Sequence, residues 1–204
     1  FRRVLFRSYN EFTYNGAGVA VGDLNGDGLQ DIYFCGNQVQ NKLYVNRGGL
    51  KFEEVIDKAK AQKKKGQWSS GVTFVDINSD GKLDIYVCNT MIHDSIMLRD
   101  LLFVNQGNDN QGIPQFKEMG SEYGITDDTQ NSISTFFDYD LDGDLDLFVA
   151  VNATLGGRNP LSVAATSNLA EALGVVVPIP VCVNDLTEIN KTTNRLTLLY
   201  IINP

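Results

Sequence analysis

The feature that most constrains the fold is a nine-residue acidic loop that occurs three times in the same register. Positions 1, 3, 5 and 9 carry aspartate or asparagine, and position 6 is always glycine. Position 7 varies in side chain, as expected if this residue coordinates a cation only through its backbone carbonyl. The residues at positions 1, 3, 5, 7 and 9 are Asp23, Asn25, Asp27, Leu29 and Asp31; Asp76, Asn78, Asp80, Lys82 and Asp84; and Asp138, Asp140, Asp142, Asp144 and Asp146.

These loops concentrate negative charge. The chain has 204 residues and a formal charge of −8, and eleven of its 25 acidic residues lie in the three loops. Neighbouring carboxylates repel one another unless a cation neutralises them, so the clustering favours metal sites. The alternative of three acidic turns that bind nothing remains open.

The donor types indicate which metal the loops would take. All the side-chain donors are hard oxygens, without histidine or thiolate, which suits Ca²⁺ far better than zinc or copper. Magnesium is the weaker candidate because it requires a strict octahedron. Gly28, Gly81 and Gly143 supply the tight turn at position 6. We therefore predict about three calcium sites.

Position 12 separates these loops from similar calcium motifs. An EF-hand needs a bidentate glutamate there and a helix behind it. The three copies have Phe34, Val87 and Val149 instead. The same residues disfavour dockerin and thrombospondin type 3 repeats, which also place an acid or amide near this position.

The acidic loops lie within a longer repeat, with spacings of 53 and 62 residues between the first aspartates. Most of the difference falls in a polar stretch, residues 106–114, which is expected to be a lengthened loop. Four short strands per repeat predict an all-β fold, a partial β-propeller built of four-stranded antiparallel blades, with about three blades present. The predicted strands are 19–21, 32–35, 42–46 and 52–55; 72–75, 85–88, 101–105 and 116–118; and 133–137 and 147–151.

The strand after the first loop is apolar on both faces, with Ile32 and Phe34 on one side and Tyr33 and Cys35 on the other. This pattern fits sheets stacked face to face. Cys35 and Cys88 hold equivalent positions in consecutive repeats, where buried packing is favoured over a disulfide because stacked sheets lie about 10 Å apart.

Several segments resemble the FG-GAP or VCBS repeat family, whose blades form the integrin α-subunit propeller and many bacterial surface proteins. The segments are Gly18–Asp23, Asn41–Asn46, Trp68–Thr73 and Phe136–Asp140. Within that family they are most similar to the bacterial ASPIC/UnbV and cartilage acidic protein group. The resemblance covers residues 14–152. It implies a propeller of about seven blades, calcium between the first two strands of a blade, and an extracellular, cell-surface or periplasmic location.

The domain organisation follows from these segments. Residues 1–8 hold three arginines and no acid, and we interpret them as a translated sequencing adaptor. Residues 9–152 are expected to form the blades. Residues 153–204 are a divergent insertion or an incomplete blade, with a helix-like piece at 167–174 and a segment, 198–203, similar to 42–46. Since three blades do not close a ring, we expect a fragment.

We expect no catalytic role for this segment. His93 is the only histidine, and no acid–base cluster lies outside the loops. The predicted function is a calcium-stabilised adhesion module that binds a protein or glycan. The alternative is the propeller part of a secreted polysaccharide lyase or hydrolase. The lysine run at 58–65 lacks interleaved aromatics, which disfavours nucleic acid, and the apolar stretch 172–183 is too short to cross a membrane.

Overall fold

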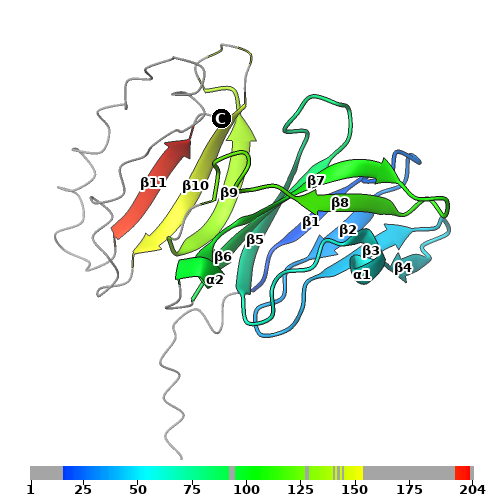
Figure 1. The fold of residues 1–204 in the computed structure, drawn as a ribbon, viewed down its shortest axis with the longest axis horizontal. Helices are drawn as coiled ribbons and strands as arrows, with labels where there is room; N and C mark the ends of the chain where they lie inside the picture. The colour runs from blue at the N-terminus through cyan, green and yellow to red at the C-terminus, as the bar shows by residue number, and fades with distance from the viewer. Residues whose placement is uncertain are drawn as a thin grey trace, which may run out of the picture.

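Three antiparallel sheets follow one another along the chain (Figure 1). The structure is a computed structural model that describes residues 16–91, 95–126, 129–139, 141, 143, 145–153 and 196–202. We call the sheets blades 1, 2 and 3. Blade 1 contains β1 Val19–Gly22, β2 Asp31–Phe34, β3 Lys42–Asn46 and β4 Phe52–Glu54; blade 2 contains β5 Trp68–Val75, β6 Asp84–Thr90, β7 Leu101–Asn108 and β8 Pro114–Glu118; blade 3 contains β9 Asn131–Phe137, β10 Asp146–Ala153 and β11 Leu196–Ile202.

Each blade begins with a hairpin that carries one acidic loop at its tip. Position 9 of the loop pairs with the end of the preceding strand: Asp31 with Gly22, and Asp84 with Val75. Blades 1 and 2 then continue in chain order to their third and fourth strands. These two blades confirm the predicted four-stranded antiparallel unit.

Blade 3 has three strands among the described residues. β11 pairs antiparallel with β10, from Leu147 opposite Ile202 to Ala153 opposite Leu196. It therefore takes the position that β3 and β7 hold in the other blades. The segment 198–203, whose sequence is similar to 42–46, falls largely within this strand.

The first strands of the three blades lie side by side (Figure 1). The Gly18 N–H donates to the Ser70 carbonyl across blades 1 and 2 at 2.7 Å. The Ser70 and Thr73 hydroxyls donate to the Asn131 and Ser134 carbonyls across blades 2 and 3, each at 2.7 Å. First strands that meet in this way give the arrangement of a partial β-propeller.

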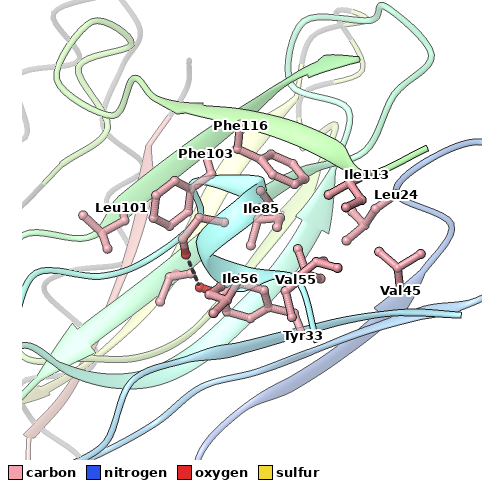
Figure 2. Close-up of a cluster of buried hydrophobic side chains, with 14 of the residues drawn as sticks. Leu24, Tyr33, Val45, Val55, Ile56, Ile85, Leu101, Phe103, Ile113 and Phe116 are labelled. Carbon is pink, nitrogen blue, oxygen red and sulfur yellow. Dashed lines mark hydrogen bonds between the residues drawn. The ribbon is translucent and has the colours of Figure 1, made fainter. Parts of the chain in front are cut away.

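A hydrophobic core fills the space between blades 1 and 2 (Figure 2). Tyr33 and Val45 of blade 1 face Ile85, Phe103 and Phe116 of blade 2, and all five are almost fully buried. Two short connections are helical: α1, Ile56–Ala59, whose Ile56 joins this core, and α2, Ser95–Leu98.

A second core lies between blades 2 and 3, where Tyr86 and Leu102 pack with Leu147 and Val149. Every residue of β6 is consequently buried, as the prediction of stacked sheets requires. Cys35 and Cys88 are both buried in the cores, which confirms the packing role.

The outward face of blade 1 differs from this pattern. Phe34 is 39% exposed, whereas its repeat equivalent Val87 is fully buried against blade 1. Val19 and Val21 are exposed on the same blade. The reason is that no sheet among the described residues covers this face.

Several predictions concern residues outside the described part of the chain: the adaptor assignment at 1–8, His93 and the helix-like piece at 167–174. Within the described residues, no helix is long and apolar enough to cross a membrane.

Candidate metal centre

The first acidic loop curls around the carboxylate of Asp23. Its Oδ1 accepts the N–H groups of Gly26 and Asp27 at 2.7 and 3.1 Å, and its Oδ2 accepts that of Gly28 at 2.7 Å. The Asn25 side-chain oxygen accepts the Asp27 N–H at 3.1 Å. The loop backbone therefore wraps around the oxygens predicted to bind a cation.

The second loop repeats this geometry. The Asp76 carboxylate accepts the N–H groups of Asp80 and Gly81 at 3.0 and 2.8 Å, and Asn78 Oδ1 accepts that of Asp80 at 3.2 Å. One feature is particular to this loop: the Lys82 ammonium lies 2.9 Å from Asp80 Oδ2. This contact lowers the pKa of Asp80, and it places a cation of the chain itself on a predicted ligand.

The third loop is described only in part, because Asp140, Asp142 and Asp144 lie outside the described residues. Asp138 Oδ2 accepts the Gly143 N–H at 3.1 Å, as the first aspartate does in the other loops. Asp138 Oδ1 is buried and has no hydrogen-bond partner among the described residues. A buried carboxylate oxygen without a hydrogen-bond donor destabilises the folded state, and a bound cation would remove this destabilisation.

Left-handed backbone occurs at two positions of each loop. Gly28, Gly81 and Gly143 at position 6 have φ of 83°, 81° and 97°, in agreement with the turn predicted for this glycine. Position 4 also has positive φ, although Ser79 and Leu141 occupy it in the second and third copies. Left-handed geometry at a non-glycine residue is disfavoured, so the contacts of the loop must enforce it.

The aspartate at position 9 braces the loop against the blade. Asp31 Oδ2 accepts the Leu24 N–H at 3.0 Å and its Oδ1 accepts the Asn46 N–H, on the third strand, at 2.8 Å. Asp84 makes the same two bonds to Ile77 and Asn105, at 3.0 and 2.7 Å.

Asp146 closes its loop in the same way, accepting the Tyr139 N–H at 2.6 Å. Burial raises the pKa of Asp31 and of Asp84, and the backbone N–H bonds only partly offset this effect. Sequence reasoning treated position 9 only as a ligand and missed this structural role.

The loops bring their predicted ligands together to different degrees. In the first two loops, positions 1, 3 and 5 gather around the curled backbone, whereas position 9 faces the blade. Among the described residues, no three acidic, histidine or cysteine side chains are already arranged to hold a metal ion. The ligand sets at positions 1, 3, 5, 7 and 9 stay predictions.

The chemistry of the residues nevertheless fits a hard divalent cation. Each carboxylate oxygen has two lone-pair sites, so an oxygen that accepts one N–H can also bind a metal. Bonds from loop N–H groups hold Asp23 and Asp76 in place. The neighbouring oxygens of Asn25 and Asn78 lie on the same loops.

Stacked antiparallel sheets, two of them four-stranded, whose first strands meet and whose first hairpins each carry an Asp/Asn loop, define a β-propeller repeat protein. The sequence model of the FG-GAP-like repeat family matches residues 23–87, from the first loop aspartate to β6. Residues 23–87 therefore form an FG-GAP-like repeat. A search of the curated proteins found no match.

Proposed function

We propose that this chain is a calcium-stabilised propeller module that holds a protein or glycan partner outside the cytoplasm. The observation that carries the proposal is the repeated curled loop, with hard oxygens at fixed positions and with the buried Oδ1 of Asp138, which has no partner in the part of the chain that the structure describes. The role of calcium in this proposal is structural, because neutralising the loops would stabilise the hairpins on which the blades are built. The finer assignment to the ASPIC/UnbV and cartilage acidic protein group belongs to the same proposal.

The proposed location follows from calcium affinity. Extracellular calcium modules have Kd values of about 10⁻⁴ to 10⁻³ M, so they fill only where calcium is millimolar. Millimolar calcium occurs outside the cytoplasm. No residue cluster in the described part of the chain favours a catalytic function for the same sites.

The test is thermal unfolding of the chain in calcium and in chelator. At ten times Kd each site adds about 1.4 kcal/mol, so three sites add about 4 kcal/mol. For a chain of this size that corresponds to a rise in Tm of about 10 °C. Magnesium at the same concentration should give a smaller rise.

The matched control removes the carboxylate at position 1 of every loop, around which the loop backbone curls. A triple variant with Asp23→Asn, Asp76→Asn and Asp138→Asn should lose most of the calcium-dependent rise in Tm. Equal Tm values in calcium and in chelator, or an undiminished rise in the triple variant, would refute the calcium role.

A further inference from the structure

The segment from Asn108, the last residue of β7, to Gly112 contacts the acidic loop of blade 1. We call this lengthened segment before β8 the β7–β8 connection. The Asn108 side-chain amide donates to the Asn25 carbonyl at 2.7 Å, and the Asn25 side-chain amide donates to the Gly112 carbonyl at 3.2 Å. The corresponding turn of blade 1 is shorter, since Phe52 follows Asn46 by six residues and Phe116 follows Asn105 by eleven. The additional residues are those that reach the loop.

A third contact lies at the base of the same loop. The Asn105 side-chain amide donates to the Leu24 carbonyl at 2.8 Å and to the Leu83 carbonyl of its own blade at 3.1 Å. Its repeat equivalent in blade 1, Asn46, donates only within blade 1, to the Gln30 carbonyl at 3.2 Å. Asn105 therefore joins the bases of the first and second loops.

These contacts orient a predicted ligand. The Asn25 amide nitrogen lies between the Gly112 carbonyl and Asp27 Oδ2, at 3.2 and 3.0 Å. With the nitrogen held there, Asn25 Oδ1 faces the curled backbone, where it accepts the Asp27 N–H. A ligand oxygen fixed before binding loses less entropy when the cation arrives.

We infer that the β7–β8 connection of blade 2 is a positioning element for the first acidic loop, which couples divalent cation binding at this loop to the docking of blades 1 and 2. This inference rests on the proposed calcium role. Coupling is reciprocal: a contact between the blades that favours cation binding must itself be strengthened by the cation.

The test is a calcium titration of the full chain labelled with ¹⁵N-glycine and followed by NMR. The amides of Gly26 and Gly28 report the first loop, that of Gly81 reports the second, and that of Gly18, bonded to Ser70 across the blades, reports docking. Asn108→Ala removes one exposed cross-blade donor. Asn110→Ala is the matched control, because Asn110 lies in the same connection and makes no hydrogen bond to the described residues.

Asn108→Ala should raise the calcium Kd of the first loop about fivefold, the equivalent of one neutral hydrogen bond, and leave the second loop unchanged. In the unsubstituted chain, calcium should slow hydrogen exchange at Gly18, and Asn108→Ala should weaken that effect. Asn110→Ala should change none of these values.

The remaining outcomes separate the two proposals. Absence of calcium shifts at every reporter glycine overturns both the proposed function and the coupling. Calcium shifts with the same first-loop Kd in Asn108→Ala overturn the coupling alone. Equal weakening of the two loops would also overturn the coupling, because it would show a general loss of stability.

Discussion

Gly71 in β5 lies against the backbone of β9 in blade 3, and replacing it should destabilise the protein strongly. A Cβ at this position would lie 2.6 Å from the Ser132 carbonyl oxygen and 3.0 Å from Ile133 Cα. Both are backbone atoms of β9, so the clash can be relieved only if one blade moves. Gly71 is not among the residues with positive φ, and the requirement for glycine here is therefore one of space.

The expected magnitude follows from the atoms involved. Overpacking costs about 1–3 kcal/mol, and a backbone obstacle favours the upper end of that range. Alanine also lowers the conformational entropy of the unfolded chain relative to glycine, which stabilises the folded state by about 0.4–1 kcal/mol. We therefore expect Gly71→Ala to lower the free energy of unfolding by about 2 kcal/mol.

Gly22 provides the matched comparison. A Cβ there would lie 2.8 Å from Phe74 Cδ2 and 2.9 Å from Leu83 Cδ1, which are ends of side chains that can rotate. Gly22→Ala should therefore cost about 1 kcal/mol or less. Urea unfolding in chelator, followed by far-UV circular dichroism, measures both variants without a contribution from bound cation. A loss below about 0.5 kcal/mol for Gly71→Ala, or a larger loss for Gly22→Ala, would refute this account of the blade contact.

Two further predictions concern single side chains. Lys82→Leu gives position 7 of the second loop the leucine that the first loop has there. Removal of the ammonium group from Asp80 should tighten calcium binding at the second loop about threefold. An unchanged or weaker calcium affinity, measured by NMR titration at the Gly81 amide, would contradict this prediction. The second prediction concerns Cys35, where burial raises the pKa of the thiol to about 12. Because the thiolate is the reactive form, iodoacetamide at pH 8 should alkylate Cys35 at least about a hundredfold more slowly in the folded than in the unfolded chain. The rate should rise about tenfold per pH unit between pH 8 and 10 while the chain stays folded. Peptide mass spectrometry measures this rate, and similar rates in both states would refute the burial argument.

The sequence was sufficient to predict the hairpins and the blade unit. Loop glycines, aspartates at fixed spacing and short apolar runs are local signals, and they located all ten predicted strands, with Lys42–Asn46 found at its observed bounds. The extension of β5 back to Trp68 was not predicted. It depends on pairing with β6 across a bulge in β5, because Ser69 pairs with Asn89 whereas Gly71 pairs with Cys88.

The remaining features could not be read from local pattern because they depend on residues distant in sequence. The brace formed by Asp84 requires Asn105 on another strand, and the contact between Asn108 and Asn25 spans 83 residues. The polar Asn/Gly/Gln composition of residues 106–114 indicated a longer loop but not what it contacts. Helix α1 has only four residues, too few to show helical periodicity.

The three loops share one backbone design but differ in the charges placed on it. The first carries three carboxylates and is held by blade 2; the second carries three, one of them paired with Lys82; the third carries five. The repeated hydrogen bonds at positions 1, 6 and 9 fix the backbone conformation of each loop. The electrostatic field in the loop differs between copies, because it depends on the residues at positions 3, 5 and 7 and on the neighbouring blade. Since Coulomb attraction to a divalent ion depends on that field, sites of common geometry need not have a common affinity. In the proposed calcium-stabilised module, loops with different fields would fill over different ranges of calcium concentration.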